Sequence, residues 1–245
     1  MARPGEWKQV GSENAFANTI AATTNGKAMY SVEQNGQLFR TDLATGDWQE
    51  LGAGGFAETR WMGFSNGHLY TLEKSGSIYR VSPQDGSYAQ VGDDYAWKES
   101  IAATALDGRL YSVERNGQLF RTDLASGAWE EIGNGDFANT RFLTATAGKL
   151  YSIESNGQLF EISPADGSYL EVGDGGFAET MLAEGVDGVL VSIEKNGQLF
   201  RTNLASGEWQ ELGDGGFAES RILLPAGSGR VFTLERSGAL YEVAI

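Results

Sequence analysis

The stretch that decides the fold runs from Ser31 to Gly52 and reads SVEQNGQLFRTDLATGDWQELG. Near copies follow at 112–133 and 192–213, with a looser version between them each time. A turn [NS]-G, two residues after a glutamate, marks each repeat. Its glycine recurs at Gly36, Gly76, Gly117, Gly157, Gly197 and Gly238. The period is 40 or 41 residues, which is typical of β-propellers, solenoids and repeat arrays.

Each repeat reads as four short strands. In the second repeat the alternating segments are 59–64, 68–73, 77–82 and 88–92. Two-residue Asn-Gly loops between alternating apolar runs are a strong hairpin signal, and no segment shows a sustained helical period. Four antiparallel strands in each of six repeats predict an all-β fold, a six-bladed β-propeller that forms a single domain over residues 1–245.

The two ends of the sequence predict how the ring closes. A fourth-strand motif, aromatic-x-x-[VIL]-G, begins at Trp7, Trp48, Tyr88, Trp129, Tyr169 and Trp209. The first copy, WKQVG, precedes every other strand, and the last repeat stops after its third strand at LYEVAI. We therefore expect the N-terminal strand to complete the last blade and to cover an edge that would otherwise be open.

The repeats alternate between two kinds. Blades 1, 3 and 5 carry RTDLATGDW, RTDLASGAW and RTNLASGEW, whereas blades 2 and 4 carry VSPQDGSY and ISPADGSY. The second residue of the first strand alternates too, as Ile20, Arg60, Ile101, Arg141, Met181 and Arg221. This pattern indicates duplication of a two-blade unit and approximate threefold symmetry.

The composition excludes several classes of function. The 245 residues include 34 glycines and no cysteine, which excludes disulfides and thiolate metal sites. A net charge of −15 argues against nucleic acid as a partner. No apolar run is long enough for a membrane helix, and the first residues, MARPGEWKQV, contain no signal-peptide core. We expect a soluble monomer, without membrane insertion, that is cytoplasmic or released without a classical signal.

Two repeated polar motifs should lie on one rim of the ring. The first is the hairpin glutamate, at Glu33, Glu73, Glu114, Glu154, Glu194 and Glu235. The second is the loop before the first strand of each blade, called the leading loop below. It carries an aromatic residue, a small residue, an acid or amide and a hydroxyl, as in Phe56-Ala57-Glu58-Thr59. Such a set can bind a sugar, because it offers an apolar ring face and fixed hydrogen-bonding groups, and adjacent glycines can expose backbone N–H groups.

Structural roles for the same residues remain open. The glutamates can pair across the hairpin with Arg40, Arg80, Arg121 and Arg201. The leading-loop aromatic residue can fill the space between blades, and the hydroxyl can cap the turn. Arginine at alternate blades is not required by the fold, so we expect Arg60, Arg141 and Arg221 to contact a ligand or form ion pairs.

The repeat resembles that of the tachylectin and tectonin β-propeller lectins. The motif G-x-G-G-F-x-x-x-R … G-x-L-Y-x-[VL]-x-x-x-G-x-[LI]-Y-R reads GAGGFAETRWMGFSNGHLYTLEKSGSIYR in blade 2 and extends through all six blades. The resemblance implies multivalent binding of glycans that carry N-acetylated amino sugars such as N-acetylglucosamine. It places the contacts in the leading loops, at Asn18, Glu58, Arg60, Glu99, Asn139, Arg141, Glu179, Glu219, Arg221, Phe56, Phe137 and Phe217.

Two other classes of function compete with a lectin. An enzyme needs unlike acids at single positions, whereas the acids here are repeated, and the only histidine, His68, lies at a variable position. We therefore expect no catalytic residues, no metal site and no cofactor. A non-enzymatic protein-interaction scaffold is the stronger alternative. It should break the symmetry of the rim with exposed aromatic residues in one sector, for which Trp61 and Trp97 are candidates.

Overall fold

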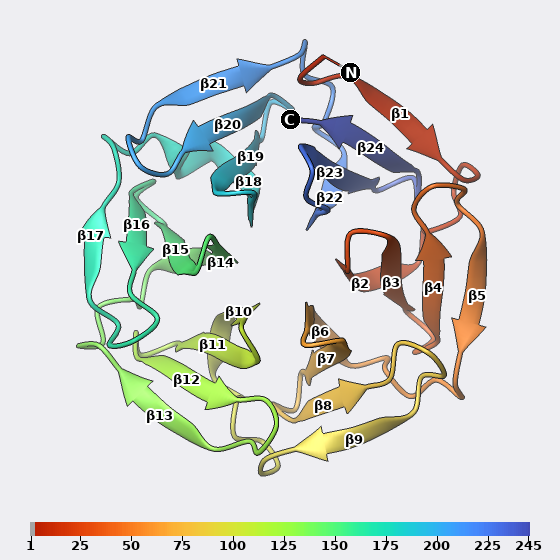
Figure 1. Ribbon diagram of the computed structural model, residues 1–245, viewed down its shortest axis with the longest axis horizontal. Helices are drawn as coiled ribbons and strands as arrows, with labels where there is room; N and C mark the ends of the chain where they lie inside the picture. Colours follow the sequence, from red (N-terminus) through yellow and green to blue (C-terminus); the bar gives the residue numbers. More distant parts are fainter. Residues whose placement is uncertain (1–2) are drawn as a thin grey trace.

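The computed structural model describes residues 3–245 and contains six four-stranded antiparallel sheets arranged around one axis (Figure 1). Within each blade, consecutive strands are hydrogen-bonded neighbours from the axis outward, except in the last blade. The protein is therefore the six-bladed β-propeller that the repeat period predicts. Within residues 3–245 the only helix is the 3-10 turn η1 (Phe177–Glu179), and no helix there is long and apolar enough to span a membrane.

The strands are short and follow the repeat closely. Blade 1 contains β2 (Thr19–Thr24), β3 (Ala28–Glu33), β4 (Leu38–Asp42) and β5 (Trp48–Leu51). Blade 2 contains β6 (Thr59–Ser65), β7 (His68–Glu73), β8 (Ile78–Val81) and β9 (Tyr88–Val91). Blade 3 contains β10 (Ser100–Leu106), β11 (Arg109–Glu114), β12 (Leu119–Asp123) and β13 (Trp129–Ile132). Blade 4 contains β14 (Thr140–Thr146), β15 (Lys149–Glu154), β16 (Leu159–Ile162) and β17 (Tyr169–Glu171). Blade 5 contains β18 (Thr180–Val186), β19 (Val189–Glu194), β20 (Leu199–Asn203) and β21 (Trp209–Leu212). Blade 6 contains β22 (Ser220–Pro225), β23 (Arg230–Glu235), β24 (Leu240–Ala244) and β1 (Trp7–Val10).

The ring closes through its first strand, as predicted. Strand β1 pairs antiparallel with β24, in a register that runs from Trp7 opposite Val243 to Val10 opposite Leu240. Figure 1 shows β1 as the outer strand of the last blade, beside the C-terminal strand. Closure therefore joins the two ends of the chain within one sheet and leaves no gap in the ring.

The hairpins that carry the repeated glutamate are longer than the sequence pattern indicated. In blade 1, Val32 lies opposite Leu38, and the backbone N–H of Glu33 donates to the carbonyl of Gln37 (2.9 Å). The loop between them has three residues rather than two, and its last residue, Gly36, has a φ of +83°. Three-residue hairpin loops need a left-handed residue at this point. The two-residue prediction is therefore wrong here, although it holds for the turn at Asn66-Gly67, where Ser65 lies opposite His68.

Each innermost strand contains a β-bulge near its start. In β6, Thr59 lies opposite Glu73 and Trp61 lies opposite Leu72, so Arg60 is the unpaired residue between them. The same shift occurs in β2, β10, β14, β18 and β22. A bulge turns a side chain out of the regular alternation. The bulge thereby directs the unpaired residue, Arg60 in β6, toward the neighbouring blade.

Glycines allow adjacent blades to approach closely at the outer ends of the strands. A Cβ added at Gly46, in the β4–β5 turn, would lie 2.3 Å from the Cα of Gly11, at the end of β1. Gly46 also has a φ of +80°, a conformation that costs an L residue roughly 1–2 kcal/mol. The glycine that ends each aromatic-x-x-[VIL]-G motif is therefore part of a contact between blades.

Among the innermost strands of the described ring, only β18 has an acid in its middle, Glu184. Its raised pKa leads us to expect that the stability of the fold depends on pH. Burial raises its pKa from the ordinary 4.5 to about 7, and the Thr144 hydroxyl donates to its Oε2 at 2.8 Å. Because the folded protein binds this proton more tightly than the unfolded chain, stability should fall as the pH rises from about 4.5 to about 7.

We expect Glu184→Gln to stabilise the fold by about 1–3 kcal/mol at pH 8 and to leave stability nearly unchanged at pH 4. Urea unfolding of both proteins at the two pH values measures the difference. An equal change in the free energy of unfolding at both pH values would contradict this account of Glu184.

Candidate functional site

The leading loop of each blade rests on the hairpin of the preceding blade. The backbone N–H of Phe56 donates to the carbonyl of Gly36 (3.1 Å), and a Cβ added at Gly36 would lie 2.8 Å from the backbone nitrogen of Ala57. The hairpin glycine and the small residue of the loop therefore serve contact between blades. The glycines expected to expose backbone N–H groups are those next to the leading loop, and of these Gly55 is exposed and lines the blade 2 pocket.

The hydroxyl of each leading loop donates a hydrogen bond to the hairpin glutamate of the same blade. The two residues lie directly opposite each other on the first and second strands, as Thr19 does to Glu33. The donor–acceptor pairs are Thr19–Glu33 (2.6 Å), Thr59–Glu73 (2.8 Å), Ser100–Glu114 (2.6 Å), Thr140–Glu154 (2.7 Å), Thr180–Glu194 (2.6 Å) and Ser220–Glu235 (2.6 Å). Each carboxylate is thus held in a fixed orientation at the rim.

The predicted glutamate–arginine pairs across the hairpin are wrong. Arg121 instead contacts Glu130 on the outer strand, at 2.5 Å, and Arg201 donates to Gln210 at 3.0 Å. The reason is register, since Arg40 lies opposite Tyr30 on the neighbouring strand, which places its side chain away from Glu33.

Burial raises the pKa of all six hairpin glutamates, and the hydroxyl hydrogen bond acts in the opposite direction. Glu73, Glu154 and Glu235 are buried, whereas Glu33, Glu114 and Glu194 are half-buried. The more accessible carboxylates therefore belong to blades 1, 3 and 5. An arginine of the preceding blade lies near each of these three and works against the rise in pKa.

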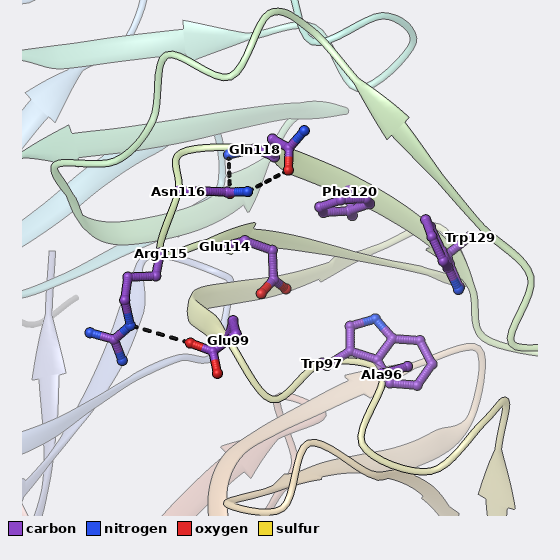
Figure 2. Close-up of a pocket in the computed structure, with 9 residues that line it drawn as sticks. All are labelled: Ala96, Trp97, Glu99, Glu114, Arg115, Asn116, Gln118, Phe120 and Trp129. Carbon is purple, nitrogen blue, oxygen red and sulfur yellow. Dashed lines mark hydrogen bonds and ion pairs between the residues drawn. The ribbon is translucent and has the colours of Figure 1, made fainter.

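A pocket lies at the rim within blade 3, between the leading loop, the hairpin and the outer strand. Its volume is about 480 Å³. Figure 2 shows the rings of Trp97, Phe120 and Trp129 around one part of it and the carboxylates of Glu99 and Glu114 beside another. An apolar wall next to fixed polar groups is the usual character of a small-molecule site.

Equivalent pockets occur in other blades but differ in size. Those of blades 1 and 5 measure about 400 Å³ and 620 Å³, and those of blades 2 and 6 about 290 Å³ and 330 Å³. In blades 1, 3 and 5 the outer wall is Trp48, Trp129 and Trp209, respectively. The largest pockets thus follow the threefold alternation of the sequence.

The outer-strand tryptophans are functional candidates that the sequence interpretation used only as strand markers. Trp48, Trp129 and Trp209 are 60%, 56% and 63% exposed. Each packs edge-on against a third-strand phenylalanine, with ring centroids 5.4 Å apart. The signal that could have found them is that an exposed strand position keeps a large aromatic residue in every repeat.

The predicted leading-loop aromatic residues are core residues. Phe56, Phe137 and Phe217 are 3%, 2% and 3% exposed. Phe56 and Phe217 also line the pockets of blades 2 and 6. Their burial favours the space-filling alternative over a stacking platform for a ligand.

The predicted leading-loop acceptors divide into two groups. Glu99 and Glu179 line pockets, as do Glu58 and Glu219. Glu99 and Glu179 form ion pairs with the glutamate hairpin of their own blade, at 3.4 Å to Arg115 and 3.0 Å to Lys195. The pairs Glu58–Lys74 and Glu219–Arg236 are equivalent, at 3.2 Å and 3.6 Å. Asn18 lines the blade 1 pocket, and Asn139 occupies the same loop position in blade 4. Exposed pairs of this kind contribute only about 0–1 kcal/mol to stability, so they leave these carboxylates able to accept from a ligand.

The three alternating arginines do not point into the pocket of their own blade. Arg60 donates to backbone carbonyls of the blade 3 leading loop, at Trp97 (2.6 Å) and at Ser100. Arg141 donates to Ala178 (2.9 Å) and Thr180 of blade 5. Arg221 reaches the carbonyls of Phe16 and Thr19 in blade 1. Their contacts therefore favour a role between blades, through neutral carbonyls rather than ion pairs.

Comparison with known proteins supports the fold alone. No protein-family model matches this chain, and no curated protein matches it significantly in sequence. Among solved structures, a protein of unknown function from Bacteroides thetaiotaomicron has a TM-score of 0.71 at 11% identity, covering 97% of this chain and 75% of its own. A catalytically inactive virginiamycin B lyase from Staphylococcus aureus, solved with quinupristin, has a TM-score of 0.66 at 13% identity, covering 98% and 100%. YCF48 bound to D1 peptide has a TM-score of 0.63 at 15% identity, covering 93% and 78%. At these identities the chain is similar to all three only in its propeller architecture.

Proposed function

We propose that this protein is a multivalent, non-catalytic carbohydrate-binding protein that holds N-acetylated amino sugars in its rim pockets. The observation that carries the proposal is the pairing of an exposed tryptophan with an oriented glutamate in the same pocket. In blade 3 these residues are Trp129 and Glu114. The arrangement recurs in blades 1 and 5, and blade 6 pairs Trp7 with the buried Glu235 in a smaller pocket.

The chemistry of these pockets suits a pyranose ring. The face of a tryptophan attracts the weakly positive C–H surface of a sugar, because the ring face carries partial negative charge. Carboxylates such as Glu114 and Glu99 accept hydrogen bonds from hydroxyl or acetamido N–H groups, and bonds to a charged acceptor are stronger than neutral ones. The resemblance of the repeat to tachylectin and tectonin lectins supports an N-acetylated sugar.

The repetition of the acids supports binding rather than catalysis. Glycoside hydrolysis uses two carboxyl groups with different roles, whereas each hairpin here carries the same glutamate with the same hydroxyl partner. Within residues 3–245 no three His, Cys, Asp or Glu side chains form a group that could hold a metal ion. His68 is the first residue of β7, at the opposite end of this strand from the hairpin glutamate Glu73.

A protein-interaction scaffold is the second candidate, and two exposed residues favour it. Tyr95 and Leu170 are 64% and 59% exposed and have no counterpart of their kind in the other blades. Tyr95 also has a φ of +64°, which is uncommon outside glycine and asparagine. Trp61 and Trp97 do not support this candidate. Trp97 is 3% exposed, and Trp61 packs beside the core of blades 2 and 3.

A glycan array distinguishes the two candidates. Labelled protein should bind glycans that end in N-acetylated amino sugars, and free N-acetylglucosamine at millimolar concentration should compete. The matched control is Arg109→Ala, an exposed residue at the start of β11, which should bind as the parent does. Binding to no glycan would contradict the proposal, and capture of a peptide through Tyr95 would favour the scaffold.

A further inference from the structure

We infer that the chain carries three ligand sites rather than six, in blades 1, 3 and 5, and that arginines of the preceding blades position them. This inference rests on the proposed function and adds its valency and its positioning residues. Arg221 serves the site of blade 1, Arg60 that of blade 3 and Arg141 that of blade 5. Four differences carry it: the outer aromatic residue separates blades 2 and 4 from the others, and the arginine clamp, the glutamate exposure and the pocket volume also separate blade 6.

The first difference is the aromatic residue of the outer strand. In blades 2 and 4 it is a tyrosine that reaches back to the leading loop of its own blade. Tyr88 and Tyr169 pack edge-on against Phe56 and Phe137, with ring centroids 5.2 Å and 5.3 Å apart. Both tyrosines also pack on the third strand, against Tyr79 and Phe160, with ring centroids 5.6 Å and 5.4 Å apart. The tryptophans of blades 1, 3 and 5 pack on the third strand in the same way, at 5.4 Å. The contact with the leading-loop phenylalanine is therefore what distinguishes the tyrosine blades.

The tyrosine hydroxyl strengthens this closure in blade 4. It donates a hydrogen bond to the carboxylate of Asp136 in the leading loop, at 3.1 Å. In blade 2 the hydroxyl of Tyr88 lies 3.6 Å from the point where a Cβ on Gly55 would be. A ligand in blade 2 or 4 would therefore have to displace an aromatic side chain that already packs against the loop.

Blade 6 is a mixed case that lacks part of the site. It keeps the outer tryptophan, Trp7, but its hairpin residue is Ser237 where blades 1, 3 and 5 have asparagine. Its pocket has a volume of about 330 Å³, and Trp7 packs on Tyr241 with ring centroids 4.9 Å apart. We therefore assign no site to this blade.

The second difference is the arginine that holds the leading loop. The bulge in β6 directs Arg60 onto the loop of blade 3, where its guanidinium binds the carbonyls of Trp97 and Ser100. These two residues flank Glu99, so the clamp fixes the loop that lines the pocket. Each charged hydrogen bond of this kind is stronger than a neutral one, and the loop is held before a ligand arrives.

The leading loops of blades 2, 4 and 6 receive no such clamp. The residues at the corresponding bulges are Ile20, Ile101 and Met181, which have no hydrogen-bond donors in their side chains. Preorganised loops bind with less loss of conformational entropy than loops that must be ordered by the ligand. The arginine clamp therefore separates blades 1, 3 and 5 from blade 6, which shares the exposed outer tryptophan with them.

The third and fourth differences lie at the pocket itself. The glutamates of blades 1, 3 and 5 are half-buried, whereas those of blades 2, 4 and 6 are buried. The pockets of blades 1, 3 and 5 all have volumes of about 400 Å³ or more, and those of blades 2 and 6 have volumes of about 330 Å³ or less. Blades 1, 3 and 5 therefore share four features: a more accessible glutamate, a larger pocket, an outer tryptophan that leaves the leading loop free, and a leading loop held by an arginine.

Fluorine NMR of protein labelled with 5-fluorotryptophan tests the pockets of blades 1, 3, 5 and 6, and isothermal titration calorimetry, which should give three sites per chain, counts any site in blades 2 and 4 as well. The chain has six tryptophans, and a Trp→Phe variant of each assigns its resonance. Titration with N-acetylglucosamine should shift Trp48, Trp129 and Trp209, together with Trp97 in the floor of the blade 3 pocket, and should leave Trp7 and Trp61 unchanged. No shift at any tryptophan would overturn the proposed function and this inference with it. A shift of Trp7 equal to that of Trp48 would overturn the valency alone.

Arg141→Met tests the positioning role, since methionine already occupies the equivalent place at Met181. We expect the dissociation constant at Trp209 to rise at least tenfold, while the shifts of Trp48 and Trp129 titrate as in the parent. A merely structural role would lower the melting temperature without separating one site from the other two. Arg109→Ala is the control and should change no site. If a folded Arg141→Met protein bound the sugar at Trp209 as the parent does, the positioning role of the arginines would be rejected.

Discussion

Replacing Trp48, Trp129 and Trp209 together by alanine is expected to abolish binding to immobilised glycans while leaving the propeller folded. Each change removes the aromatic wall of one large pocket. Truncating a central tryptophan of a binding site typically costs about 2 kcal/mol or more, which weakens each site roughly 30-fold. Several weak sites on one chain bind an immobilised glycan tightly, because the first contact raises the effective concentration for the others. Weakening all three sites should therefore leave no measurable retention of the protein on immobilised glycan.

The fold should tolerate these changes, because all three side chains are more than half exposed. We expect the free energy of unfolding to change by about 1 kcal/mol or less for each. The matched control is the double variant Tyr88→Ala and Tyr169→Ala, which removes the same outer position from blades 2 and 4. It should retain full binding. If the tryptophan triple variant still bound glycans, these pockets would be excluded as the glycan-binding sites.

Deleting residues 1–10 is expected to destabilise the whole ring rather than one blade. Strand β1 is the outer strand of blade 6, and Val10 in it is only 4% exposed. The deletion exposes the edge of β24 and the apolar side chains beneath it. The loss of one buried aliphatic side chain costs about 1.5–3 kcal/mol, and the hydrogen bonds of four register pairs are lost as well.

We therefore expect the free energy of unfolding to fall by about 3 kcal/mol or more, with a single transition. Deleting residues 1–3 alone is the control, because it keeps β1 and Gly5, whose N–H donates to the carbonyl of Ala244 at 2.8 Å. Urea unfolding followed by tryptophan fluorescence measures both variants. A deletion variant as stable as the control would show that the described β1–β24 pairing does not hold the ring together.

The fold could be predicted from sequence because every blade repeats the same turn and strand signals. Turn glycines, alternating apolar residues and the displaced fourth-strand motif WKQVG all indicate the same ring. The strands of blade 2 begin and end within a residue of the predicted segments. The hairpin loops that carry the repeated glutamate differ in length, as at Gly36, because Asn-Gly at the end of a three-residue loop looks like a two-residue turn in the sequence.

The candidate site was harder to predict, because its contacts cross strands and blades. The partner of Glu33 is Thr19, which lies opposite it across the first hairpin, rather than Arg40 across the second. The spacing between hydroxyl and acid is 14 residues in blades 1 to 5 and 15 in blade 6, and this recurrence could have revealed the pair. Arg60 belongs to blade 2 in the sequence but holds a loop of blade 3, because a β-bulge redirects it. Nothing in the local sequence shows such a change of direction.

A crystal structure of the protein soaked with N-acetylglucosamine tests the central claim most directly. The account predicts electron density for the sugar in the pockets of blades 1, 3 and 5, with its ring on Trp48, Trp129 and Trp209 and hydrogen bonds to Glu33, Glu114 and Glu194. Crystals in which these three pockets remain without sugar, or in which the sugar lies on the opposite rim, would contradict it.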